Sequence, residues 1–244
     1  MHGAQATARF VVGIIGNIIS FGLFLAPLPT FKRIWQKKST EEFHPYPYLA
    51  TLMNCIFWIW YGIPIVHPDS TLVVTTNGIG LALEIAYLSL FFYYTTKKNR
   101  VIILGVLFVE LVVFAILAVI TLSCFHTTYY RSMFVGIICI IFGTIMYAAP
   151  LSIVWKVFNT KSAEFLPFWL CFAGFLNGIC WFGYAFLKKP DPYLMIPNGL
   201  GAVLGFIQLC VHTYYTHVAK QRALVQDDAK AGELQLEKQD ISPV

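Results

Sequence analysis

Two asparagines and two tryptophans recur at the same depth of separate apolar stretches of the chain. Asn77 and Asn198 lie about midway along theirs, and Trp58 and Trp181 also lie in mid-stretch. A buried amide without a partner costs about 1–3 kcal/mol, so each asparagine needs a neighbouring polar group or a wet cavity. An amide both donates and accepts hydrogen bonds, and flat indole rings can stack on the C–H face of a sugar ring. The four residues therefore predict a pocket for a small polyhydroxylated ligand.

A structural role is the alternative for each of these residues taken singly. Three further asparagines, Asn17, Asn54 and Asn177, also lie within apolar stretches. A lone intramembrane amide commonly joins neighbouring helices, at about 0.6 kcal/mol per hydrogen bond, and a lone tryptophan in mid-span is usually packing. What favours a pocket is that the amides and the indoles recur together.

Seven apolar segments must position these side chains. The chain has 244 residues, of which 58% are hydrophobic and 12% charged, and its mean hydropathy is +0.68. That charge is too little to cover a surface in water, where about 25% is usual. In lipid the backbone must satisfy its own hydrogen bonds, so segments near the required length of about 20 residues are helices. The predicted spans are 10–32, 46–66, 71–95, 101–124, 132–155, 167–187 and 192–217.

An internal repeat organises these spans. Residues 12–39 align with 135–162 at a constant offset of 123, and the same offset pairs Asn54 with Asn177 and Trp58 with Trp181. An offset of 121 pairs Asn77 with Asn198. The sequence thus predicts an all-α membrane protein whose seven transmembrane helices form two parallel triple-helix bundles joined by a linker helix (3+1+3). A single linker span gives both bundles the same orientation, and parallel repeats of this kind occur in transporters. The predicted parts are a first repeat (10–95), the linker helix (101–124), a second repeat (132–217) and a disordered cytosolic tail (218–244).

The basic residues orient the bundle. Most Lys and Arg residues fall in the loops on one side of the predicted membrane and in the tail, although the net charge is only +5. The positive-inside rule places that side in the cytosol, with the N-terminus outside and the C-terminus inside. Because the basic residues stand at the ends of apolar runs, we expect no nucleic-acid partner.

Four prolines repeat on the predicted cytosolic side. Pro27 and Pro150 fall inside apolar spans, where each removes a hydrogen bond and bends the helix. Pro47 and Pro167 stand near the start of a span, where proline is well tolerated. Bends at matched depth predict a flexing cytosolic gate.

Enzyme chemistry has no candidate site in the sequence. There is no Gly-rich phosphate loop, no HExxH motif, no Ser/His/Asp group at membrane depth and no metal-ligand spacing of Cys and His. We expect neither an enzyme nor a cofactor. Two carboxylates, Glu84 and Glu110, lie at membrane depth without a counterpart in the other repeat. For Glu84 we favour a structural hydrogen-bonding role, while proton coupling remains open.

The two repeats resemble the MtN3/saliva units of the SWEET sugar transporters, in the plant style and the hexose-carrying branch. The first unit carries APLPTF at 26–31 and NCIFWIWYG at 54–62. The second carries APLSIVWK at 149–156, NGICWFGY at 177–184 and IPNGLG at 196–201. The resemblance implies bidirectional, facilitated movement of mono- or disaccharides by alternating access, without ATP.

The resemblance also assigns residues. The sugar pocket would comprise Asn77, Asn198, Trp58, Trp181, Ser20, Leu23, Asn54, Gly143, Met146 and Asn177. The cytosolic gate would comprise Pro27, Pro47, Pro150 and Pro167, and Tyr61 with Asp191 would help to close the outer side. Sucrose-preferring members tend to carry Ser where this chain has Asn54 and Asn177, so the larger amides favour hexoses. Gly143 stands where a pocket Ser is common and returns some of that space.

Two other classes compete with a sugar uniporter. A proton-coupled small-solute carrier would draw on Glu84 and Glu110. A seven-helix receptor shares the topology but lacks this duplication. The expected partners are a small sugar and the lipid bilayer of, most simply, the plasma membrane. Assembly as a homo-oligomer, or as a hetero-oligomer with related transporters, stays open.

Overall fold

The computed structural model describes residues 2–187 and 189–240, and these residues are helical almost throughout. The helices are α1 (His2–Phe24), α2 (Leu28–Lys37), α3 (Tyr46–Gly62), α4 (Thr71–Tyr94), α5 (Lys97–Cys124), α6 (Thr128–Ile145), α7 (Ala148–Thr160), the 3₁₀ turn η1 (Ala163–Phe165), α8 (Phe168–Phe186) and α9 (Pro192–Asp240). No strand occurs in this part of the chain. The predicted all-α fold is confirmed.

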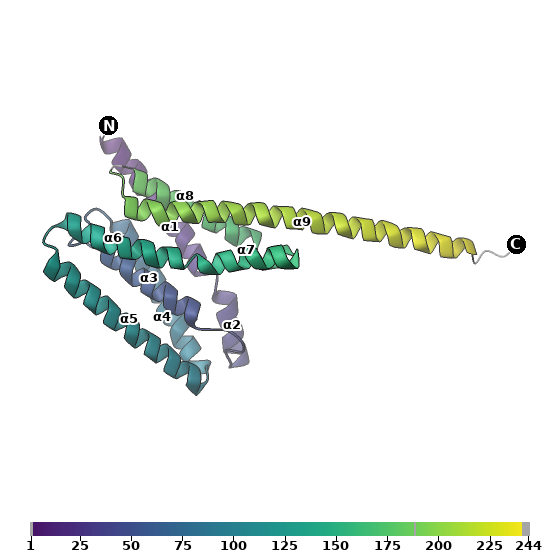
Figure 1. The fold of residues 1–244 in the computed structure, drawn as a ribbon, viewed down its shortest axis with the longest axis horizontal. Helices are drawn as coiled ribbons and strands as arrows, with labels where there is room; N and C mark the ends of the chain where they lie inside the picture. The colour runs from purple at the N-terminus through teal and green to yellow at the C-terminus, as the bar shows by residue number, and fades with distance from the viewer. Residues whose placement is uncertain (1, 188, 241–244) are drawn as a thin grey trace.

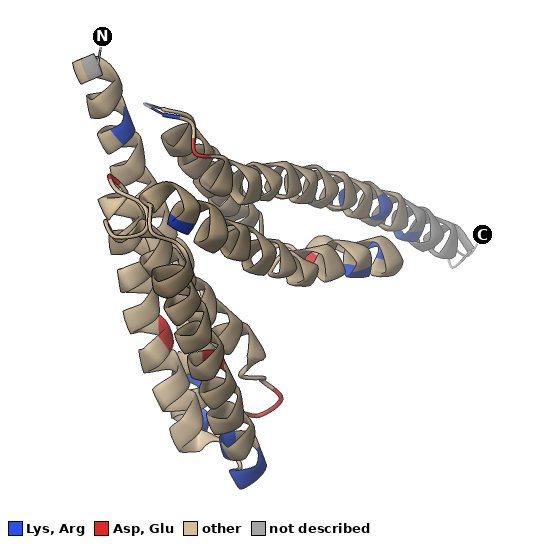
Figure 2. Cartoon of the chain, turned by 60° about the vertical axis from the view of Figure 1, so that its left-hand side comes forward, with Lys and Arg blue, Asp and Glu red and all other residues tan. Residues whose placement is uncertain are grey.

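Seven of the resulting segments cross the membrane. Six are long and apolar enough by themselves: Gly3–Lys37, Thr71–Tyr94, Lys97–Cys124, Thr128–Thr160, Phe168–Phe186 and Pro192–Gln226. The remaining segment, which is second along the chain, is α3, with 17 residues, many of them buried among its neighbours. The first and fifth segments are each divided, into α1 and α2 and into α6 and α7 (Figure 1). Figure 2 shows Lys and Arg mostly near helix ends, separated by long stretches that contain neither.

The helices form two units with the same internal order. In the first unit α4 packs on both α1 and α3, and in the second unit α9 packs on both α6 and α8. The units meet where α1 packs on α8 and where α3 packs on α6. The linker α5 packs on α3, α4 and α6 and turns many large apolar side chains outward, as a lipid-facing helix does. The expected 3+1+3 arrangement is thus the one that the structure has.

Proline accounts for the division of the first membrane segment into α1 and α2 and of the fifth into α6 and α7. Between α1 and α2, the amide of Ala26 donates to the carbonyl of Leu23 at 3.1 Å, in a 3₁₀ pattern, and Pro27 then caps α2. Tyr147 likewise donates to Thr144 at 3.1 Å, and Pro150 is the third residue of α7. A proline has no N–H to continue the helical ladder. The sequence predicts a bend around a proline inside one helix; the structure instead has two helices with the proline at or just after the break.

At each break one glycine lets an aromatic ring pack closely on the third helix of the same unit. A Cβ atom on Gly80 of α4 would lie 2.7 Å from both Cε atoms of Phe24, and one on Gly201 of α9 would lie 2.5 Å from the Tyr147 hydroxyl oxygen. The offset of 121 pairs the glycines, and the offset of 123 pairs Phe24 with Tyr147. Each aromatic ring at a break therefore lies directly over a glycine backbone.

The C-terminal residues differ from the sequence prediction. We expect a disordered tail over 218–244, whereas α9 continues as a helix to Asp240 and extends well beyond the bundle (Figure 1). Residues 218–240 are rich in Ala, Leu, Lys, Glu and Gln, which have high helix propensity. Charge and low hydropathy exclude a packed core here, but they do not exclude a helix that continues a span.

Gly80→Ala should destabilise the protein, because the added methyl group meets the ring of Phe24. Overpacking of this kind costs about 1–3 kcal/mol. Gly78→Ala is the matched control on the same helix, since a Cβ there meets nothing within 4 Å. We expect thermal unfolding in detergent to shift downward for Gly80→Ala and to stay level or rise for Gly78→Ala. Equal shifts for the two variants would contradict the close approach of Phe24.

Candidate functional site

A cavity of about 300 Å³ lies between the two units and is lined from six helices and one helix break. All ten predicted pocket residues line it: Ser20, Leu23, Asn54, Trp58, Asn77, Gly143, Met146, Asn177, Trp181 and Asn198. Small-molecule sites commonly measure about 300–1,000 Å³, so this cavity suits a small ligand. The structure brings these residues together, and their binding role stays a prediction.

Seven further lining residues escaped the sequence interpretation: Phe24, Thr51, Val73, Thr76, Tyr147, Leu194 and Pro197. Six of them are pairs under the repeat offsets. The offset of 123 joins Phe24 to Tyr147, and the offset of 121 joins Val73 to Leu194 and Thr76 to Pro197. Extending each offset to the neighbours of the known pocket residues would have found them, although most of their side chains are not polar.

The two central amides are held in the same way. Asn77 Nδ2 donates to the carbonyl of Val73 and Asn198 Nδ2 donates to the carbonyl of Leu194, each at 2.8 Å. Both bonds span four residues of the same helix, and they fix the amide planes toward the cavity. Within the described residues neither amide oxygen accepts a hydrogen bond from the protein. Each asparagine thus keeps an acceptor for a ligand hydroxyl.

The tryptophans lie at one end of the cavity, which is tightly packed. Trp58 packs edge-on against Tyr61 at 5.6 Å between ring centroids, and Trp181 packs edge-on against Tyr184 at 5.3 Å. Both indoles are buried, with 7% and 5% exposure. Lining residues farther along the cavity, such as Asn54, are only partly buried. Access to the cavity is therefore from the end opposite the tryptophans.

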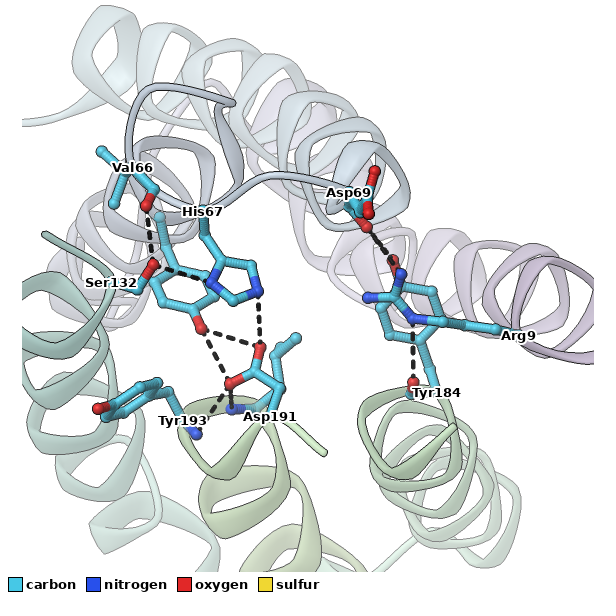
Figure 3. A network of polar contacts seen from close by, with 10 residues as sticks. Arg9, Val66, His67, Asp69, Ser132, Tyr184, Asp191 and Tyr193 are labelled. Carbon is cyan, nitrogen blue, oxygen red and sulfur yellow. Dashed lines mark hydrogen bonds and ion pairs between the residues drawn. The ribbon is translucent and has the colours of Figure 1, made fainter. Parts of the chain in front are cut away.

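A polar network closes the tryptophan end (Figure 3). The Tyr61 hydroxyl group lies 2.9 Å from each carboxylate oxygen of Asp191, so the predicted contact between α3 and the start of α9 is present. Asp191 also accepts from the amides of Tyr193 at 3.1 Å and Leu194 at 3.4 Å. It therefore caps the N-terminus of α9, where Pro192 occupies the first helical position. One carboxylate both starts a helix and joins the two units.

His67 and Ser132 extend this network and were not found from the sequence. His67 stacks on the Tyr61 ring at 4.7 Å, and its Nε2 lies 3.5 Å from Asp191. Ser132 Oγ donates to the carbonyl of Val66 at 2.7 Å and lies 2.9 Å from His67 Nδ1. Because Ser132 donates its only hydroxyl proton to the carbonyl of Val66, the hydrogen bond between Ser132 and His67 must use a proton on His67 Nδ1. Neutral His67 then has no proton on Nε2 to give to Asp191.

A second contact joins the units on the far side of this end (Figure 3). An Arg9 guanidinium nitrogen donates to the carbonyl of Asp69 at 2.8 Å, and Arg9 Nε donates to the carbonyl of Tyr184 at 3.4 Å. The guanidinium also lies over the Tyr184 ring at 4.1 Å. Arg9 and Ser132 are separated by the repeat offset of 123. The same position on the first helix of each unit thus holds the closed end by different chemistry.

The four prolines lie at the other end and do not line the cavity. Pro27 and Pro150 are half-buried at the helix breaks, and Pro47 and Pro167 are exposed near the starts of α3 and α8. There α2 packs on α4, while α7 packs on η1 and α9, each within its own unit. The structure places the prolines where the units diverge, and their gating role stays a prediction.

The intramembrane carboxylates do not fit the expected structural role. The Oε2 atoms of Glu84 and Glu110 are buried, and neither has a hydrogen-bond partner among the described residues. Glu84 makes no side-chain hydrogen bond in this part of the chain, so the structure gives no support to the bonding role that the sequence favours. Neither carboxylate lines the cavity.

The fold and the site define a polytopic membrane protein of the parallel-repeat transporter class, with its cavity between the repeats. The family model "Sugar efflux transporter for intercellular exchange" (MtN3/saliva) matches residues 10–99 and 133–220. The chain belongs to this family, as the resemblance of its two repeats indicates.

Relatives and a solved structure agree with that assignment. The chain is 50% identical over 210 residues to the bidirectional sugar transporter SWEET5 of Arabidopsis thaliana, covering 86% of this chain and 87% of the relative. It is 52% identical over 214 residues to SWEET7 of the same plant, covering 87% and 83%. A eukaryotic SWEET transporter solved at 3.7 Å resolution superposes with a TM-score of 0.84 at 38% identity, covering 88% of this chain and 99% of that one.

Acidification should loosen the closed end through His67. Burial lowers the pKa of His67 and outweighs Asp191, which raises it; Arg9 and Lys189 lower the pKa further, and Asp69 raises it. When this end opens and His67 meets water, its pKa returns toward about 6.5. The proton therefore favours the opened state, and the closed state loses stability as pH falls through about 6.5 and below.

Spin labels at Pro68 and Tyr129, both exposed near this end, can report the opening in reconstituted protein. We expect a longer-distance population to grow as the pH is lowered. His67→Gln should remove that response, whereas His44→Gln, a change in the exposed loop after α2, should retain it. A response that survives in His67→Gln would assign the effect to another group.

Proposed function

We propose that the chain is a bidirectional, facilitative transporter of small sugars that works by alternating access. The observation that carries the proposal is the cavity between the repeats, with matched amides of Asn77 and Asn198 inside it and a closed network at one end. Hydrogen-bonding groups flanked by buried indoles suit a ligand with hydroxyl groups and C–H faces. Relatives at about half identity carry the name of bidirectional sugar transporters.

Hexoses are the favoured substrates. The cavity of about 300 Å³ is at the small end of the range for ligand sites. The amide side chains of Asn54 and Asn177 both line it and reduce the space left for a second sugar ring. A single ring fills such a cavity while still reaching the central amides.

We infer that the cavity opens toward the cytosol in this state. Basic residues concentrate at the proline end of the bundle, and the positive-inside rule assigns that end to the cytosol. The N-terminus and the network of Tyr61 with Asp191 then lie on the outer side of the plasma membrane. Transport requires that this network opens and that the proline end closes.

A proton-coupled carrier is the second candidate. Glu84 and Glu110 support it, because each has a buried carboxylate oxygen without a partner among the described residues. Neither carboxylate contacts the cavity, so a coupling proton would have to act on the substrate through the helices α4 and α5. The uniport mechanism needs no such relay.

Passive transport predicts that net flux follows the sugar gradient alone. In proteoliposomes loaded with labelled glucose, flux should reverse when the gradient is reversed, and a protonophore should leave it unchanged. Asn77→Ala and Asn198→Ala are the controls, because each removes an amide from the cavity and should abolish the flux in folded protein. Accumulation of glucose above the external concentration would contradict the uniport mechanism. If a protonophore abolished that accumulation, the proton-coupled carrier would be favoured.

Pro27 should act in gating and not in binding. With Pro27→Ala, the new N–H can donate to the carbonyl of Leu23, which now accepts from Ala26, and the break between α1 and α2 can close into one helix. We expect sugar flux in vesicles to fall at least tenfold while equilibrium binding to purified protein changes only as far as the state populations shift. Pro29→Ala, two residues further into α2, is the matched control and should leave flux near normal. Equal losses of binding and flux in Pro27→Ala would show that this proline shapes the cavity.

A further inference from the structure

The two sides of the cavity differ at several matched positions, and one of these pairs a serine with a glycine. The repeat offset of 123 pairs Ser20 of α1 with Gly143 of α6. Both residues line the cavity, and each belongs to the helix that packs on the second helix of the opposite unit. The cavity-lining asparagines on those second helices are matched as well, because the same offset pairs Asn177 of α8 with Asn54 of α3. The side chain at this position is therefore a polar group beside the matched asparagines that the repeat does not duplicate.

On the Ser20 side the polar groups satisfy one another. Ser20 Oγ donates to Asn177 Oδ1 at 2.7 Å and accepts from Trp181 Nε1 at 3.1 Å. The serine hydroxyl group thus donates its one hydrogen bond to the amide oxygen and accepts a hydrogen bond from the indole N–H. Ser20 is 6% exposed, so these hydrogen bonds are buried and already satisfied without a ligand.

On the Gly143 side the same groups lack that hydroxyl. Asn54 Oδ1 is buried and has no hydrogen-bond partner among the described residues. Trp58 Nε1, the counterpart of Trp181 Nε1, donates to no group in that part of the chain. Leaving a buried amide oxygen unpaired is unfavourable, and a hydroxyl group from elsewhere can pair it.

There is room for that hydroxyl group beside Gly143. A Cβ atom built on Gly143 would meet only Pro197 Cβ, at the ordinary van der Waals distance of 3.6 Å. A Cβ atom therefore fits at this position, and because Gly143 lines the cavity, a serine hydroxyl group could project into its open space. The Asn54 amide rotates about a broad torsion, so its oxygen can turn toward that space.

We propose that Gly143 creates a hydrogen-bonding subsite in which one hydroxyl group of the sugar takes the place of the missing serine hydroxyl. The sugar hydroxyl donates to Asn54 Oδ1 and accepts from Trp58 Nε1. Gly143 is then a specificity-determining residue, because it makes one side of the cavity depend on the ligand to complete its hydrogen bonds. This inference rests on the proposed function and deepens it: it requires a substrate with a hydroxyl group projecting from one side of the ring toward the first unit.

Binding of glucose and of the monodeoxyglucoses, each lacking one hydroxyl group, tests the subsite in purified protein. We expect the wild-type protein to bind one of these analogues about tenfold more weakly than glucose because that hydroxyl fills the subsite. In Gly143→Ser the protein supplies the hydroxyl, so the same analogue should bind as well as glucose does. Uniform binding of all the analogues to the wild type, or an unchanged preference in Gly143→Ser, would overturn the proposal.

Two further variants use the repeat as an internal control. Ser20→Gly opens the matching position on the other side, and we expect a second hydroxyl group of glucose to become important for binding. The swap variant Ser20→Gly with Gly143→Ser moves the subsite across the cavity and should restore dependence on a single hydroxyl group. A swap variant that shows no such dependence would contradict the subsite.

Thermal stability of the ligand-free protein gives a readout that does not depend on transport. Gly143→Ser pairs the oxygen of Asn54, whereas Gly143→Ala adds a Cβ atom and leaves that oxygen unpaired. The serine variant should therefore unfold at a higher temperature than the alanine variant. Equal unfolding temperatures would mean that Asn54 is already satisfied by water, which overturns the subsite. If the wild type binds no glucose at all, the proposed hexose transport fails instead, and the comparison of unfolding temperatures still tests the unpaired amide.

Discussion

Hydrogen bonding in a low-dielectric surrounding is the constraint on which the structure depends. Lipid offers no partner to a free N–H or C=O group, so irregular backbone at membrane depth is tolerated only where protein or a wet cavity covers it. The two helix breaks obey this rule. Leu23 and Phe24 end the first helix at the cavity wall, and Met146 and Tyr147 do so in the second unit. The cavity and the breaks therefore lie together: the residues at the breaks line the space between the units, which is the place where irregular backbone at this depth is tolerated.

The repeat accounts for the shape of the cavity, and departures from the repeat account for its chemistry. Matched glycines seat the aromatic residues at both breaks, and matched asparagines make the same bond to their own helices. At the closed end the match fails. Tyr61 reaches a carboxylate, whereas the hydroxyl group of Tyr184 lies 3.4 Å from the carbonyl of Asp69. Each side nevertheless has one charged hydrogen-bonding group, the Asp191 carboxylate on one and the Arg9 guanidinium on the other, so the two sides are held by charges of opposite sign.

Residue types and spacing predicted the spans, the repeat and the matched Asn and Trp residues of the cavity, because lipid makes buried amides costly. The other cavity-lining residues that were predicted, such as Leu23, Gly143 and Met146, came from the resemblance to a known family, since their types carry no such signal. Sequence alone missed the part of the closed end that depends on neighbours from different units. His67 pairs with Pro190 under the offset of 123, and Arg9 pairs with Ser132, so no recurring residue type marked either position. It also misplaced the C-terminal end of α9, because a continuous helix needs no apolar face once it has left the bundle. The failures thus fall where contact is made by loops and helix ends, and not where composition dictates burial.

The small difference between the two sides of the cavity matters because a sugar has no two-fold axis. A cavity with perfect symmetry would offer such a ligand two equal poses related by the axis between the units. Ser20 donates a hydrogen bond to Asn177 on one side, while the oxygen of Asn54 has no partner among the described residues on the other. A difference of about 1.4 kcal/mol between two poses is tenfold in their populations. One missing side chain is therefore enough to orient the ligand, while the duplicated backbone around it still lets the two units move in the same way.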